Sequence, residues 1–248
     1  MMSSKTELII RRTKTGVANC WRNSRKLIAS YSIFITLCLV TYAAETLDPE
    51  VKLGLSLSSG RYYGIVTSIF VHSSWAHVSS NMYILAWLAV VLVLLQNMNS
   101  YKSARCIHHL FFWMPFVSAI LANSFFVYLA PRLIAEGASG FDYAVIAVVV
   151  FSSLFGINGT MQRVGVREYF QSAKHWFVLA VSLLFAVPFL ALIMYEPRLF
   201  LNVAPGVNSF VHGLSFAIAM ILTVGYFAYE REHSASRKTN TAQEQATV

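Results

Sequence analysis

The residues best suited to chemistry lie in a small turn, Gly137-Ala138-Ser139-Gly140, ahead of a long apolar run at residues 143–156. If that run is a membrane helix, Ser139 lies in its first turn. Backbone N–H groups there have no intrahelical partners, and anions are stabilised. Ser139 could then act as a nucleophile if a base reaches it, or it could simply cap the helix.

Histidines and an asparagine in other apolar runs could complete such a site. His212 lies near the start of the last run, and its neutral imidazole can accept a hydroxyl proton at neutral pH. His77 and Asn81 are four residues apart, so they share one helix face and can donate hydrogen bonds to an oxyanion or to a neighbouring helix. His72 and His77 have neither an HExxH pattern nor an acidic partner, so we predict no metal site.

Composition indicates the class of protein. The 248 residues are 56% hydrophobic and only 12% charged, and the mean hydropathy is +0.57. A soluble domain has roughly twice that charged fraction. Because the bilayer core cannot satisfy open backbone groups, we expect an all-α polytopic bundle. Its six spans are predicted at residues 27–44, 66–95, 106–129, 139–156, 176–195 and 207–229.

The polar ends of the chain frame this membrane domain. Residues 1–27 form a basic arm, residues 28–229 the six-helix domain, and residues 230–248 a polar tail that we expect to be disordered. The arm is long and the first apolar run nearly spans a bilayer, which favours a retained helix over a cleaved signal peptide. The three cysteines are scattered and predict no disulfide framework.

The positive charge is distributed unevenly about these spans. All but four of the 19 Lys and Arg residues fall on the side that holds both termini; the four are Lys52, Arg61, Arg132 and Arg198. Cytoplasmic loops carry such an excess, so both termini are predicted to be cytoplasmic. The net charge of +8 is therefore a topology signal, with the lipid bilayer rather than nucleic acid as partner.

This topology places the candidate residues at one depth. Ser139, His212, His77 and Asn81 come from three spans, and all lie near the outer end. Polar groups within a membrane are costly and usually face a cavity or a partner, so their convergence predicts a site. Tyr143, one turn after Ser139, could support the imidazole from below. No aspartate is placed to orient His212, which favours a dyad over a triad.

Taken together, these motifs resemble those of the rhomboid intramembrane serine proteases. The run H-S-S-W-A-H-V-S-S-N at residues 72–81 is similar to the family's H-x4-H-x3-N motif, and residues 137–140 are similar to its GxSG motif. His212 and Tyr143 match the base and the tyrosine that follows the nucleophile. The resemblance covers about residues 45–225, with three separated motifs in the family's order.

The resemblance implies a fold, a reaction and a set of residues. It implies a six-helix bundle with a wet cavity open to the outside, no cofactor, and cleavage of transmembrane helices of single-span proteins near their outer end. Ser139 would be the nucleophile and His212 the base. His77, Asn81 and the Ser139 backbone N–H would form the oxyanion hole. The supporting residues would be Tyr143, His72, Gly137 and Gly140.

The chain also departs from the family pattern. Ser215 and Ala219 stand where the family usually has glycine, although both are small enough for close packing with Gly140 and Ala144. Asp142 is unusual for its position. Tyr63-Gly64 replaces a Trp-Arg pair before the second span.

Two other classes of protein are alternatives to a protease. The first is a catalytically inactive rhomboid-like pseudoprotease that binds transmembrane clients, although such proteins normally lose the serine or the histidine and this chain keeps both. The second is a small transporter or channel, for which an internal repeat would be expected and is not seen. The predicted location is the plasma or inner cell membrane, with the site open to the extracytoplasmic side. Neither the substrate's identity nor the oligomeric state is predicted.

Overall fold

Six long helices form most of the part of the protein that the structure describes. A computed structural model describes residues 4–58, 61–98, 108–130, 134–201 and 209–246. The long helices are α1 (Ser4–Leu47), α4 (Trp75–Met98), α6 (Met114–Leu129), α7 (Ser139–Val164), α9 (Ala173–Tyr195) and α11 (Ser209–Ala246). Six stretches in the described part are long and apolar enough to cross a membrane: Ser24–Leu47, Trp75–Gln96, His109–Leu129, Ser139–Gln162, His175–Tyr195 and Ser209–Glu232. The prediction of an all-α, six-span bundle is confirmed.

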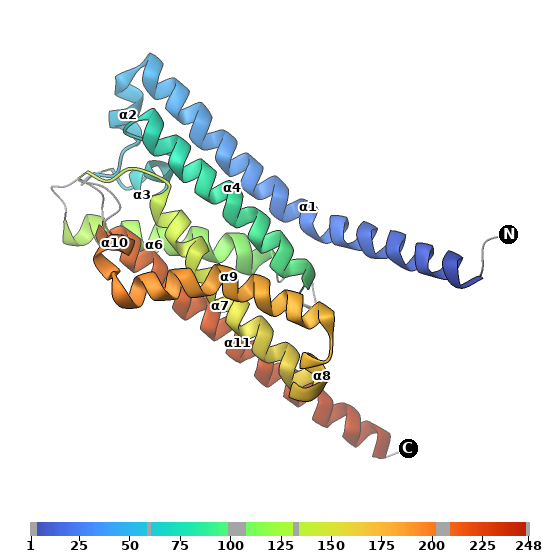
Figure 1. Ribbon diagram of the computed structural model, residues 1–248. Helices are drawn as coiled ribbons and strands as arrows, with labels where there is room; N and C mark the ends of the chain where they lie inside the picture. The colour runs from blue at the N-terminus through green and yellow to red at the C-terminus, as the bar shows by residue number, and fades with distance from the viewer. Residues whose placement is uncertain (1–3, 59–60, 99–107, 131–133, 202–208, 247–248) are drawn as a thin grey trace.

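Short elements connect these helices at the two ends of the bundle. At one end lie α2 (Pro49–Leu55), α3 (Gly64–Thr67), the 3-10 turn η1 (Ser68–Phe70) and α10 (Pro197–Leu201). At the other lies α8 (Val166–Phe170), and a π-helical turn η2 (His109–Trp113) leads into α6. Both chain termini lie at the α8 end (Figure 1). This arrangement agrees with an even number of spans.

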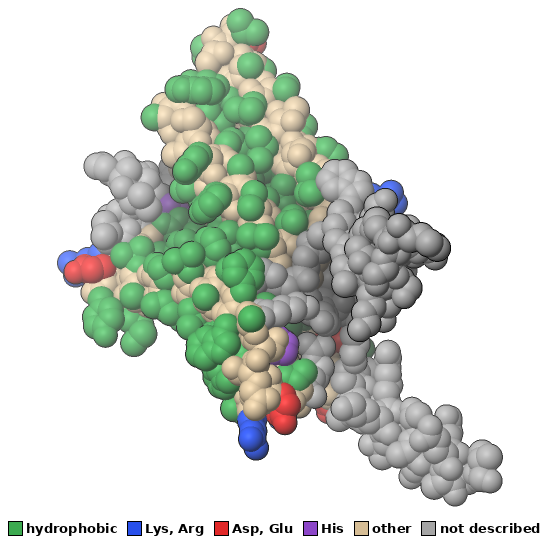
Figure 2. Space-filling model, turned by 45° about the vertical axis from the view of Figure 1, so that its right-hand side comes forward, with side chains coloured by type: hydrophobic (Ala, Val, Ile, Leu, Met, Phe, Trp, Pro, Cys, Tyr) green, Lys and Arg blue, Asp and Glu red, His purple; other side chains and the backbone are tan. Residues whose placement is uncertain are grey.

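Helix α7 is the central helix of the bundle (Figure 1). In its most apolar stretch 83% of residues are buried, against 17% in α9 and 22% in the spanning part of α1. The outer helices instead present apolar side chains outward, and Figure 2 shows such side chains over most of the visible face, with charges at its margins. Because α7 is enclosed by protein, a polar group at its start needs a protein partner rather than lipid.

Small residues let α7 and α11 approach closely near the start of both helices. A Cβ atom placed on Gly140 would lie 2.9 Å from Cγ1 of Val211 and 3.1 Å from Oγ of Ser215. Both distances are shorter than ordinary van der Waals contact. Ser215 and Ala219 are completely buried, so the packing accommodates both residues that replace the family's glycines.

The second span starts later than predicted. The sequence placed its start near Val66, but α4 begins at Trp75, after Val71 has turned to an extended conformation. Ser74 explains the start, because its Oγ accepts a hydrogen bond of 3.2 Å from the His77 N–H. A serine that caps the third N–H of a helix favours a non-helical backbone at its own position.

The ends of the chain also differ from expectation. Helix α1 begins at Ser4, and α11 continues to Ala246 through residues that we predicted to be disordered. Once a long apolar helix is nucleated, each added residue gains one hydrogen bond, and Ala, Glu, Gln, Lys and Arg favour continuation. The division of the chain into arm, domain and tail stays a prediction.

Asp142 lies in the protein interior, apart from the face of α7 that meets α11. Its side chain is 3% exposed, and neither carboxyl oxygen has a hydrogen-bond partner among the described residues. Tyr31 and Cys38 of α1 are close enough to interact with it electrostatically. Asp142 therefore lies within electrostatic range of α1 and also of Tyr143, but it makes no hydrogen bond to the described residues.

Candidate active site

A strained turn places Ser139 at the start of α7. Gly137 has a φ of +113°, a conformation that residues with a Cβ rarely adopt. Its N–H donates a 2.9 Å hydrogen bond to the carbonyl of Ser68, which holds the turn against η1. Ala138 is the N-cap and Ser139 the first helical residue. The serine was predicted in the first turn, and its backbone N–H is one of those without an intrahelical acceptor.

His212 on α11 contacts the Ser139 hydroxyl. Its Nε2 atom lies 2.7 Å from Ser139 Oγ, a hydrogen-bond distance. The imidazole is 2% exposed. With a neutral ring, the hydroxyl donates to Nε2, which is the geometry in which an imidazole can remove the proton as the oxygen attacks an electrophile. The close packing of α7 and α11 at Gly140 makes this distance possible.

Tyr143 supports the imidazole from one side. The two rings stack with centroids 4.3 Å apart and an interplanar angle of 12°. The Tyr143 hydroxyl donates to the carbonyl of Phe200 in α10. The ring is therefore held at both ends, by its own helix and by α10, and this restricts the orientation of His212. The contact with Phe200 could not be predicted, because the acceptor is a backbone carbonyl.

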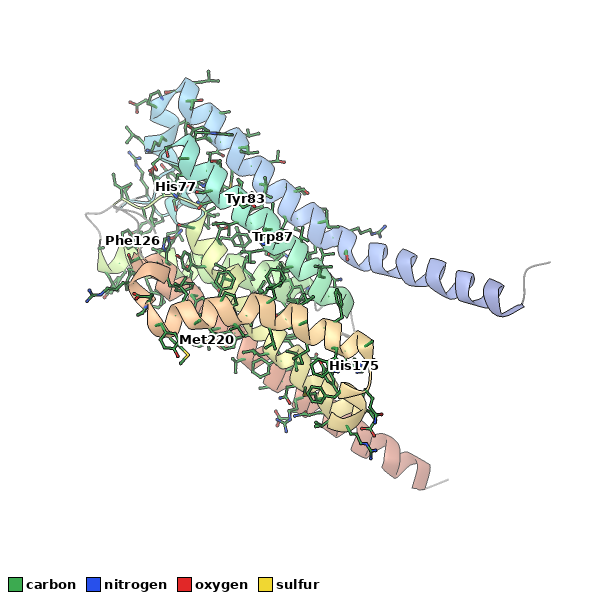
Figure 3. The ribbon with its side chains drawn as sticks, viewed as in Figure 1. His77, Tyr83, Trp87, Phe126, His175 and Met220 are labelled. Atoms are coloured by element: carbon green, nitrogen blue, oxygen red, sulfur yellow. The ribbon has the colours of Figure 1, made fainter. Side chains whose placement is uncertain are left out.

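His77 and Asn81 lie on the opposite side of the turn, on α4. A Cβ atom on Gly137 would be 2.8 Å from Cε1 and 2.9 Å from Nε2 of His77, and 3.8 Å from Nδ2 of Asn81. Ser73 Oγ lies 3.1 Å from Nδ1 of His77. Asn81 is 6% exposed, and its Nδ2 has no partner among the described residues. Figure 3 shows His77 at the end of the bundle where α2 and α3 lie.

His72 links the segment before α4 to the same turn. Its Nε2 accepts a 3.3 Å hydrogen bond from the Ala138 N–H, and its Nδ1 lies 3.1 Å from the carbonyl of Phe70. Burial, together with the neighbouring imidazole of His77, lowers the pKa of His72 to about 4. At neutral pH the ring is therefore uncharged, with the proton on Nδ1 and the lone pair on Nε2.

Two further contacts of this region are not apparent from the sequence. Glu45 at the end of α1 accepts a 3.2 Å hydrogen bond from the His72 N–H. Leu57 and Ala135 form an isolated antiparallel bridge that joins the loop after α2 to the loop before Gly137. Glu45 directly follows the first predicted span, residues 27–44, and only the structure places it inside α1. The sequence therefore held no signal for this contact.

The predicted site residues are thus gathered at one end of the bundle. Among the described residues, no group of three or more His, Cys, Asp or Glu is placed to hold a metal ion. The arrangement is a half-buried serine against a buried histidine at a helix N-terminus, with two side-chain hydrogen-bond donors across the turn. The molecule is therefore a six-helix membrane protein with a polar Ser–His site at one end.

Comparison with known families agrees with this description. The family model of the Rhomboid domain matches residues 59–229, well over half of the chain. The protein therefore belongs to the rhomboid family. A search of curated proteins finds no match to the chain.

Proposed function

We propose that the protein is an intramembrane serine endopeptidase that cleaves transmembrane helices of single-span proteins near their outer end. The observation that supports this proposal most is the 2.7 Å contact between Ser139 Oγ and His212 Nε2. A hydroxyl in hydrogen-bond contact with an imidazole at a helix N-terminus has the two requirements of acyl transfer. These are a base for the nucleophile and donors for the developing oxyanion.

The proposed reaction has two stages. Ser139 Oγ attacks the carbonyl carbon of the scissile bond while His212 Nε2 accepts the hydroxyl proton. His212 then gives this proton to the leaving amine as the C–N bond breaks, and an acyl-enzyme remains. Water attacks the ester, His212 accepts its proton and returns it to Ser139 Oγ, and the second fragment leaves as a carboxylic acid.

The donors near the turn are assigned to the oxyanion in this proposal. Negative charge develops on the carbonyl oxygen in both stages, and preorganised donors stabilise it without reorganisation. Asn81 Nδ2, His77 Nε2 and the Ser139 N–H are the candidates. His72, Gly137 and Gly140 would support the turn, and Tyr143 would support the base. We further propose the plasma or inner cell membrane as the location, with cytoplasmic termini and a site open to the extracytoplasmic side.

A fluorophosphonate that reacts with activated serines tests the nucleophile directly. We expect the purified protein to form a covalent adduct, and peptide mass mapping should find it on Ser139. An adduct on another serine, such as Ser73, would contradict the assignment. Labelling at Ser139 without cleavage of any reconstituted single-span protein from a broad panel would instead favour a client-binding role.

The amide of Asn81 provides a separate test of the oxyanion site. Asn81→Ala should lower kcat by about 10²-fold or less, because it removes one donor to the transition state. Asn158→Ala is the matched control, since Asn158 is an exposed asparagine of α7 that accepts a hydrogen bond from Gln162. Cleavage rates of the two variants should be compared at equal amounts of folded protein. Equal rates would remove Asn81 from the oxyanion site.

A further inference from the structure

Glu45 is a buried carboxylate in the last turn of α1. Its side chain is 7% exposed, and its Oε2 accepts the 3.2 Å hydrogen bond from the His72 N–H. Its Oε1 has no partner among the described residues. Burying a carboxylate costs free energy because the group loses its hydration, unless its interactions offset that loss. A single hydrogen bond offsets little of this cost, so Glu45 does not have an obvious role in stability.

The contact of Glu45 leads directly to the nucleophile turn. His72 receives a hydrogen bond from the Ala138 N–H on its ring, while its own backbone N–H is held by Glu45. Ala138 precedes Ser139, whose hydroxyl meets His212. Three successive contacts therefore connect the end of α1 to the Ser139–His212 pair, and the first two of them are buried.

The position of Glu45 in the chain adds a second observation. The Rhomboid domain match begins at residue 59, so α1 lies outside the matched region. Within the matched region, Ser68 and His72 both contact the turn through single hydrogen bonds. Glu45 fixes the backbone of the segment that carries His72.

The charges around Glu45 also belong to the loops that frame the turn. Lys52 of α2 forms a 3.1 Å ion pair with Glu136, which directly precedes Gly137. Both are close enough to influence the Glu45 carboxyl electrostatically. The end of α1, α2 and the loop before Ser139 thus form one connected polar patch beside the site.

We propose that Glu45 is a positioning residue for the nucleophile turn. Its carboxylate holds the His72 backbone, so that the His72 ring accepts from the Ala138 N–H and keeps Ser139 Oγ within reach of His212. This inference rests on the proposed protease function. It assigns to α1 a part in the reaction, beyond its role as a membrane span.

The test uses the full-length protein in detergent or bilayers, with Glu45→Ala and Glu45→Gln. Glutamine keeps a side-chain oxygen that can accept from the His72 N–H, whereas alanine does not. We expect Glu45→Ala to lower kcat by up to about tenfold, the value of one hydrogen bond, with KM unchanged. Glu45→Gln should stay within about twofold of the original protein. Active-site titration with the fluorophosphonate corrects for any misfolded fraction.

Glu50→Ala is the control, because Glu50 is an exposed acidic residue only five positions further along. Unchanged kcat in Glu45→Ala would overturn the inference, and so would a Glu45→Gln variant as slow as Glu45→Ala. A rise in KM with kcat preserved would also overturn it, since that pattern indicates substrate binding. If the unsubstituted protein forms no adduct on Ser139, the proposed function fails and this inference fails with it. Normal behaviour of Glu45→Ala in a reactive protein overturns this inference alone.

Discussion

Replacing Ser139 by alanine is expected to lower kcat for peptide-bond cleavage by about 10⁵-fold or more, and His212→Ala should have a comparable effect. The two residues act as a unit, because the hydroxyl becomes nucleophilic only as His212 Nε2, 2.7 Å away, accepts its proton. Their effects should therefore not add: the double variant should be about as slow as either single variant. Turnover of a reconstituted single-span substrate measures all three.

Matched controls separate this loss from a loss of folding. Ser124→Ala removes a hydroxyl that only bonds the Ile120 carbonyl within α6, and His109→Ala removes an exposed imidazole at η2. Both should retain turnover near that of the original protein. If Ser139→Ala kept more than about one hundredth of the activity, a different nucleophile would be indicated. If the double variant were slower by the product of the single effects, the dyad would be wrong.

Replacing Gly137 by alanine is expected to have the second largest effect, a fall in kcat of at least about 10²-fold. The new Cβ would lie 2.8 Å from the His77 ring, at a backbone φ of +113° that alanine rarely adopts. Either the turn or His77 must move. A displacement of about 1 Å in a reacting group can cost about 10²-fold in rate. The substitution should also lower thermal stability, by about 1–3 kcal/mol for the strained backbone.

Gly159→Ala, in the helix that follows the turn, provides the comparison. A Cβ at Gly159 meets no atom within 4 Å, and alanine favours a helix over glycine by about 0.5–1 kcal/mol. We expect its activity to be unchanged and its melting temperature to be equal or slightly higher. Turnover and thermal unfolding should be measured on both variants. A fully active Gly137→Ala protein would show that the distance between the turn and His77 is not critical.

Much of the architecture follows from local properties of the sequence. A bilayer-spanning helix requires about twenty apolar residues, and this requirement applies to each segment separately. The six spans could therefore be predicted without knowing how they pack. The start of α7 at Ser139 was also predicted, because a serine just before a long apolar run is typical of a helix N-terminus.

Other boundaries depend on local chemistry that hydropathy does not detect. Residues 66–71 are apolar enough to have been predicted as the start of the second span. In the structure, however, η1 and an extended Val71 come before α4. The difference arises because Ser74 caps α4 while the Ser68 carbonyl is needed by Gly137. Backbone groups used by a distant turn leave no signal in the sequence of either segment.

The candidate site shows the same division. The sequence by itself determined which residues lie at the same depth in the membrane. The position of each residue along its span, together with the number of spans, sets this depth for Ser139, His212, His77 and Asn81. Only the tertiary structure decided which atoms meet: Ser139 Oγ with His212 Nε2, and the Tyr143 ring against the imidazole. It also brought Glu45 to His72 across 27 residues. The physical reason is that the depth of a residue depends on its own helix alone, whereas its contacts depend on how neighbouring helices are rotated and how closely they approach. Side-chain packing sets that rotation and approach, as where Gly140 packs against Val211 and Ser215.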